Sequence, residues 1–188
     1  MLETATLTAV FRDLVRTAMV AQQVDSSETI EFYLVQLLCS FARPRQTDLL
    51  DPPLALDYLA AQSLPSTQRY EKLKRVADTA LFVTGIFTES LDRSLVGPDY
   101  YATLGRNAYA RLSTEPNPGL ALLFHELAGR FPEFVRVLAE ISASEMFRSD
   151  QDTLRLYRRW VVTRGQREAD LLVRRGIIPF APRTQQRH

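Results

Sequence analysis

The sequence has few of the residues that build catalytic, redox and metal sites. Its 188 residues include one cysteine, two histidines and seven glycines. A single cysteine cannot form a disulfide within the chain, which fits a reducing compartment. No cysteines or histidines lie at metal-ligand spacing, and the glycines form neither GxGxxG nor GxxxxGK, the loops that hold nucleotide phosphates. We therefore expect no metal, no cofactor and no enzyme activity.

The isolated candidates for chemistry are interpreted as structural residues. His125 lies in HELAG, which lacks the second histidine that a zinc-peptidase helix places four residues later, and is expected to be partly buried. Cys39 lies in the apolar run YLVQLLCSF, which contains no histidine or basic residue that could activate the thiol. We expect a buried, unreactive thiol.

Long apolar runs are also missing. No segment approaches the ~18 consecutive apolar residues that a membrane helix needs. The N-terminus carries Glu3, Arg12 and Asp13 among its apolar positions and lacks a basic start, unlike a secretory signal. With 46% hydrophobic and 24% charged residues, the composition is typical of a globular protein. We predict a cytoplasmic protein with one domain over residues 1–180 and a disordered tail over 181–188.

The spacing of apolar residues predicts an all-α fold. They recur at i, i+3, i+4 and i+7 almost throughout, and no sustained alternation of period two appears. We expect seven or eight helices in an irregular bundle and no sheet. Asp25 is predicted to cap the second helix and Asp99 a later one, while Pro132 implies a kinked helix or two abutting ones. The last long helix is expected to start at Ser149 or Asp150.

The central helix is predicted from Thr67 to about Thr88 and contains the run VADTALFVTGIF. A surface helix keeps a polar face, so this almost wholly apolar run indicates a buried one. Its only strong charge, Asp78, should then be paired inside the fold, and an arginine is the expected partner. Gly85 within the run is expected to permit a close helix crossing or a bend.

Charge is distributed unevenly along the chain. From Gln151 onward nine arginines face three acids, a net charge of +6, so residues 1–150 carry −5 although the whole chain carries +1. Only Lys72 and Lys74 are lysines. Opposite patches of charge can steer association between proteins, and arginine and aromatic residues are enriched at binding hot spots. The predicted partner surface comprises Arg155, Arg158, Arg159, Trp160, Asp92, Arg93, Tyr100 and Arg106.

These features favour a non-enzymatic interaction or regulatory protein that associates with itself or with another protein. Two alternatives stay open. The arginine-rich last helix, with Tyr157 and Trp160 interleaved, could bind nucleic acid, or a helical pocket could hold an apolar small molecule. The polar cluster between Glu89 and Tyr109 is interpreted chiefly as structural.

One segment carries a family resemblance. The stretch ALFVTGIFTESLDRSLVGPDYYATLGRNAY resembles a motif of an uncharacterised bacterial family of helical proteins. The resemblance implies a bacterial origin and one structural unit that includes Phe82, Gly85, Tyr101 and Tyr109. It implies no activity, cofactor or catalytic residue.

Overall fold

All regular secondary structure in the described part of the chain is α-helical. The computed structural model describes residues 2–42, 53–87, 97–115, 118–144, 167 and 171. These residues contain seven long helices and no strand, as the apolar spacing predicts. The helices are α1 (Leu2–Ala21), α2 (Glu28–Ala42), α3 (Leu54–Ala61), α4 (Ser66–Ile86), α6 (Pro98–Leu112), α7 (Pro118–Gly129) and α8 (Phe131–Ala143).

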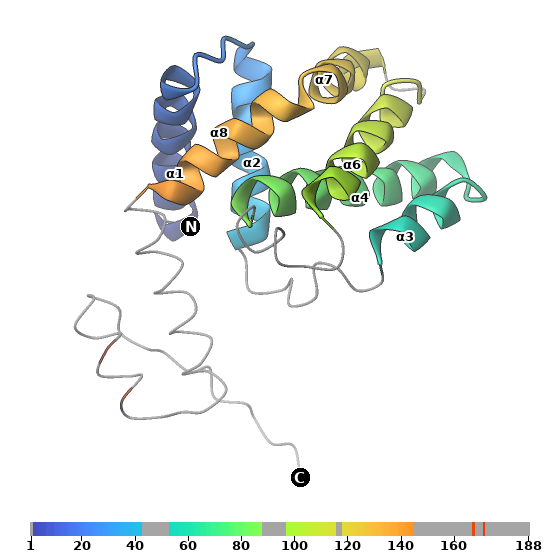
Figure 1. Ribbon diagram of the computed structural model, residues 1–188, viewed down its shortest axis with the longest axis horizontal. Helices are drawn as coiled ribbons and strands as arrows, with labels where there is room; N and C mark the ends of the chain where they lie inside the picture. Colours follow the sequence, from blue (N-terminus) through green and yellow to red (C-terminus); the bar gives the residue numbers. More distant parts are fainter. Residues whose placement is uncertain are drawn as a thin grey trace. The chain divides into compact units, whose positions relative to one another are not determined.

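Contacts divide the chain into two units, Met1–Ser142 and Ala143–His188. The helices belong to the first unit, apart from the last residue of α8. Figure 1 shows the α1–α2 pair at one end of this unit and α3 at the other. The predicted last helix from Ser149 or Asp150 lies outside the described residues except at positions 167 and 171, which are helical, and the predicted tail at 181–188 lies outside them.

Helix α4 is the centre of the first unit. Every residue from Val76 to Ile86 is buried, which confirms the prediction drawn from the apolar run. Helices α2, α3 and α6 pack against α4, and α8 reaches it through Leu138. The buried Thr84 hydroxyl donates a hydrogen bond of 2.7 Å to the Ala80 carbonyl, so this polar side chain is satisfied within its own helix.

Two glycines let neighbouring helices approach closely. A Cβ on Gly85 would overlap the Cβ of Leu138, which confirms the expected close crossing at this position. A Cβ on Gly105 of α6 would lie 2.7 Å from the Phe131 ring and 2.9 Å from the Ala80 Cβ. The absent side chains therefore set the distances of α8 and α6 from the central helix.

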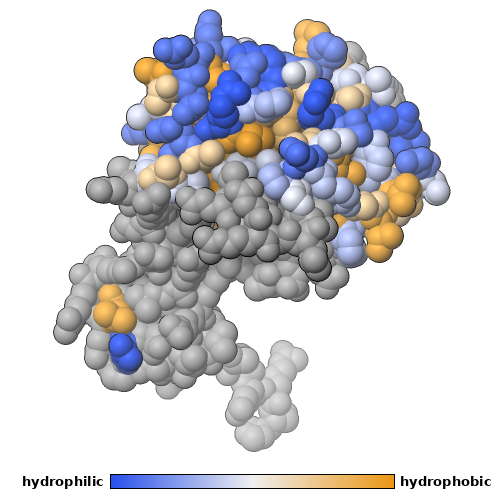
Figure 2. All heavy atoms as spheres, viewed as in Figure 1, coloured by the Kyte–Doolittle hydropathy of each residue, from blue (hydrophilic) through white to orange (hydrophobic). Residues whose placement is uncertain are grey.

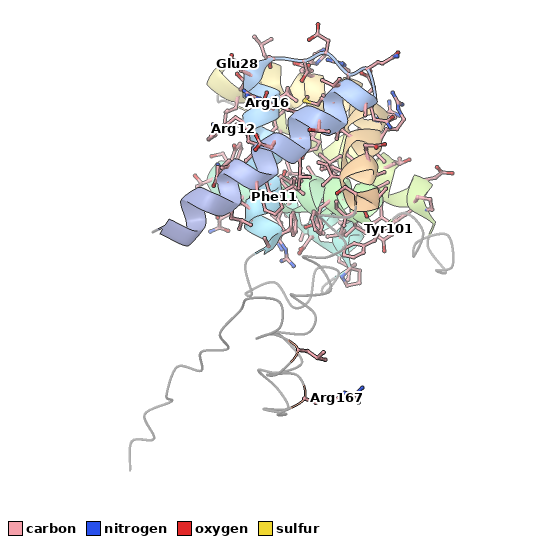
Figure 3. The ribbon with its side chains drawn as sticks, turned by 90° about the vertical axis from the view of Figure 1, so that its left-hand side faces the viewer. Phe11, Arg12, Arg16, Glu28, Tyr101 and Arg167 are labelled. Atoms are coloured by element: carbon pink, nitrogen blue, oxygen red, sulfur yellow. The ribbon has the colours of Figure 1, made fainter. Side chains whose placement is uncertain are left out.

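The connection between α1 and α2 is closed by backbone hydrogen bonds. The Val24 amide donates to the Met19 carbonyl at 2.9 Å and the Gln23 amide to the Val20 carbonyl at 3.1 Å, the pattern of a Schellman motif. Gln23 takes a φ of 54°, a left-handed conformation that favours glycine. The motif stops α1 and turns the chain toward α2. Figure 3 shows the outer side of this helix pair, with Arg12, Arg16 and Glu28 labelled.

Two predicted helix caps are wrong, for local reasons. The Ile30 amide donates to the Ser27 hydroxyl at 3.3 Å, so Ser27 rather than Asp25 caps α2, which begins at Glu28. Helix α6 begins at Pro98 with Gly97 as its N-cap, so Asp99 lies in the first turn and does not cap. Proline fits this first position because its missing amide proton would have had no helical partner.

The run interrupted by Pro132 forms two helices. Helix α7 ends at Gly129 and α8 begins at Phe131, so the abutting pair is correct rather than the kinked helix. Arg130 lies at the junction and forms ion pairs with Glu126 at 2.8 Å and with Glu133 at 2.7 Å. Its guanidinium lies 5.5 Å from the centre of the Phe134 ring. These contacts join the end of α7 to the first turn of α8.

Candidate functional site

The most concentrated polar chemistry in the described residues surrounds Asp78 on α4. Its Oδ1 accepts hydrogen bonds from the Tyr33 hydroxyl of α2 at 2.5 Å and from the Tyr109 hydroxyl of α6 at 2.8 Å. Its Oδ2 accepts from the Lys74 ammonium at 2.5 Å. The carboxylate is only 13% exposed. One buried charge therefore joins three helices, as a buried carboxylate must be compensated by partners.

Aromatic rings enclose these hydroxyl groups. The Tyr109 ring stacks on Phe124 of α7 with 6.0 Å between centroids, and the Tyr33 ring meets Phe124 edge to face at 6.1 Å. Burial, together with the adjacent Asp78 charge, raises the pKa of Tyr33 and of Tyr109 well above its usual value. Both tyrosines are thus neutral hydrogen-bond donors at neutral pH. Neither is suited to acid or base catalysis there.

Asp78 is buried and paired, but its cationic partner differs from the expected arginine. Lys74, one helical turn earlier on the same helix, forms the ion pair and also lies 5.2 Å from the centre of the Tyr33 ring. The i, i+4 spacing of Lys74 and Asp78 is the signal in the sequence that identifies this pair. The two tyrosines come from distant segments, so sequence spacing could not identify them.

A second buried carboxylate, Asp57, lies on α3 and was not singled out from the sequence. It is 2% exposed. Lys72 of α4 reaches its Oδ1 at 2.6 Å, and Arg75 lies 3.3 Å from its Oδ2. Arg75 and Asp57 Oδ2 are close enough to form an ion pair, but they form no hydrogen bond. These ion pairs fasten α3 to the central helix.

The outer face of α3 is apolar, which inverts the usual pattern of a surface helix. The helix reads LALDYLAA, and its only charged residue, Asp57, points inward. Leu56 and Leu59 point outward and are 58% and 59% exposed. Figure 2 shows hydrophobic surface gathered over this part of the molecule. Single exposed leucines need no explanation, but a helix that exposes leucines while burying its acid does.

The predicted partner surface is only partly described. Arg155, Arg158, Arg159, Trp160, Asp92 and Arg93 lie outside the described residues. Tyr100 and Arg106 both lie exposed on α6, with Tyr100 edge to face against Tyr101 at 5.2 Å between centroids. Six residues of α-helix separate the pair by about 120° around the axis, so these two residues do not share one face.

The two isolated candidates behave differently from each other. Cys39 is buried, with its Sγ 3.7 Å from the Thr8 hydroxyl, as expected for an unreactive thiol. His125 is exposed, so the expectation of a partly buried histidine is wrong. The buried face of α7 is formed by Leu123, Phe124 and Leu127, and His125 projects from the opposite side.

Comparison with known proteins finds no matching family model, no matching curated protein and no matching solved structure. Within the described residues, no group of three or more His, Cys, Asp or Glu side chains could hold a metal ion. No described helix combines the length and apolar character needed to cross a membrane. The outer face of α3 is a feature of the described chain that packing within the fold does not explain.

Proposed function

We propose that this protein is a non-enzymatic interaction protein that binds a short apolar segment of another protein on the outer face of α3. The observation that carries the proposal is the inverted polarity of this helix. Because Leu56 and Leu59 are 58% and 59% exposed, the fold forgoes more than half of the roughly 1.5 to 3 kcal/mol that full burial of each leucine side chain would contribute. A partner that covers both leucines recovers this free energy.

The small size of the face favours a short segment over a second copy of the chain. A helix of eight residues is about 12 Å long. A stable dimer buries about 800 Å² on each partner, far more than one side of such a helix offers. The interaction is thus expected to be transient, and the purified chain to be a monomer.

Matched variants test this proposal. Leu56→Glu with Leu59→Glu changes the α3 face, whereas Val20→Glu with Leu122→Glu changes apolar residues that are even more exposed, at 79% and 82%. Proteins captured from a lysate of the source organism by the parent and the control, but not by the α3 variant, support the proposal when the purified parent is monomeric by light scattering. Equal capture by both variants contradicts it.

A parent that is a dimer, and that dissociates only in the α3 variant, would identify a second copy as the occupant and overturn the choice of partner. Both variants replace residues at the surface, where substitutions usually change the free energy of unfolding by no more than about 0.5 kcal/mol. Equal melting temperatures for the two variants confirm that the comparison concerns binding rather than folding.

A further inference from the structure

The rotation of α3 about its own axis is not explained by the hydrophobic effect. Its inner side buries Leu54 and Ala61, and its outer side exposes Leu56 and Leu59. A turn of half a revolution would bury the larger apolar pair. The feature that opposes this turn is Asp57, which the same rotation would move from its buried position to the surface.

The ion pairs of Asp57 oppose this rotation of α3. Its carboxylate lies 2.6 Å from Lys72 and 3.3 Å from Arg75, both on α4. The two cations keep part of their side chains in water, being 32% and 46% exposed, while the side chain of Asp57 is only 3% exposed. A carboxylate held by cations at a helix interface fixes orientation, because any other rotation separates the charges.

We propose that the Asp57 ion pairs act as an orientation lock, which holds α3 with its leucine face toward solvent, and that removing the lock turns α3 over. Through one carboxylate, the lock maintains the exposed leucine face that the proposed function requires. The lock rests on the proposed function only for the use of that face. The orientation itself is measured without any partner.

Cysteine accessibility measures the orientation directly, since the native Cys39 is buried and provides a slow background. Leu59→Cys places a thiol on the outer face of α3, and Ala61→Cys places one on the inner face, where Ala61 is fully buried. Each is introduced into the full-length parent chain and into a chain that also carries Asp57→Leu. The rate of reaction with a maleimide is then compared between the two backgrounds.

The lock predicts opposite changes at the two positions. In the Asp57→Leu background the Leu59→Cys thiol should react about tenfold more slowly and the Ala61→Cys thiol about tenfold faster, because burial limits labelling to rare local opening. Faster reaction at both positions would mean that α3 unfolds locally instead of turning. Unchanged rates at both would mean that Asp57 does not set the orientation. Either result overturns the inference.

A second variant keeps the proposal testable if the Asp57→Leu variant does not fold. Replacing Lys72 and Arg75 together by Met removes both cations, so the unpaired Asp57 carboxylate is more stable in water than at the helix interface. This double variant should therefore produce the same opposite changes in labelling. Circular dichroism of each background verifies its helix content. If labelling changes in opposite directions at the two positions but no protein partner binds, the proposed function alone is refuted. If labelling changes in the same direction at both positions, the lock alone is refuted.

Discussion

The Tyr109 hydroxyl donates a hydrogen bond of 2.8 Å to Asp78 Oδ1 across 31 residues of sequence. Tyr109 is completely buried on α6, and Asp78 lies on the central helix α4. Tyr33 of α2 donates to the same oxygen, so the carboxylate fixes two helices relative to the third. Hydrogen bonds to a charged group are stronger than neutral ones, which makes this cluster a principal determinant of how the helices pack.

Replacing Asp78 by alanine is expected to lower the free energy of unfolding by about 3 kcal/mol. The change leaves the Tyr33 and Tyr109 hydroxyl groups without their acceptor in a largely buried site, and each unsatisfied group costs about 1 to 3 kcal/mol. Urea denaturation followed by circular dichroism measures the loss. Asp13→Ala, at an exposed site on α1, is the control and should change the stability by no more than about 0.5 kcal/mol. Equal stabilities for the two variants would contradict a structural role for Asp78.

The raised pKa values of Tyr33 and Tyr109 predict a loss of stability in alkali. Their folded-state pKa exceeds the usual 10.0, so above that pH the unfolded chain binds fewer protons than the folded one. The free energy of unfolding is unaffected by ionisation of these tyrosines below about pH 10. It declines as the pH rises from there through their folded-state pKa values, by up to about 1.4 kcal/mol per pH unit for each tyrosine.

Denaturant titrations at about pH 9 and about pH 11 test this window of alkaline loss. Tyr109→Phe removes one of the two buried tyrosines bonded to Asp78 and should make the decline with pH shallower, although the variant starts from a lower stability. Tyr33→Phe should act in the same direction. A slope that stays as steep in both variants would assign the alkaline loss to other groups.

The sequence predicted the helical architecture well because apolar periodicity is a local signal. The all-apolar run identified α4, and Gly85 identified a close crossing that Leu138 of α8 provides. The identity of the crossing helix could not be predicted, since it depends on contacts over 50 residues apart in a chain with no repeat. Both wrong caps involved an aspartate close to a helix start, where Ser27 and Gly97 occupied the capping position instead.

The polar sites were harder to predict than the helices. The i, i+4 spacing contains the Lys74–Asp78 pair, so the lysine partner could be read from the sequence, whereas the prediction named an arginine. The sequence does not indicate that Asp57 is buried, because a single acid in a short apolar helix normally marks the solvent face. Its inward orientation depends on Lys72 and Arg75 of α4, so only the tertiary structure reveals the exposed leucine face.

Gly85→Ala is expected to destabilise the protein although alanine is the better helix former. The propensity gain of about 1 kcal/mol is opposed by the overlap of the new methyl group with the Leu138 Cβ, an atom that cannot move without its backbone. Overpacking of this kind costs typically 1 to 3 kcal/mol, and more where the backbone must shift. Chemical denaturation measures the net change. Gly129→Ala is the matched control, since nothing lies within 4 Å of its new Cβ, and it should be neutral or stabilising.

Gln23→Gly should raise the free energy of unfolding by about 0.5 to 1 kcal/mol. Gln23 adopts a φ of 54°, which strains a residue with a Cβ but not glycine. The hydrogen bonds of the turn come from the backbone, including the 2.9 Å bond from the Val24 amide to the Met19 carbonyl, so glycine preserves them. Gln22→Gly, one residue earlier and without a positive φ, is the control and should destabilise, because glycine loses more conformational entropy on folding and because the exposed Gln22 hydrogen bond to Glu140 is lost. Thermal and urea denaturation of both variants separate the two effects. Loss of stability in both would show that glycine's entropy cost exceeds the strain at Gln23.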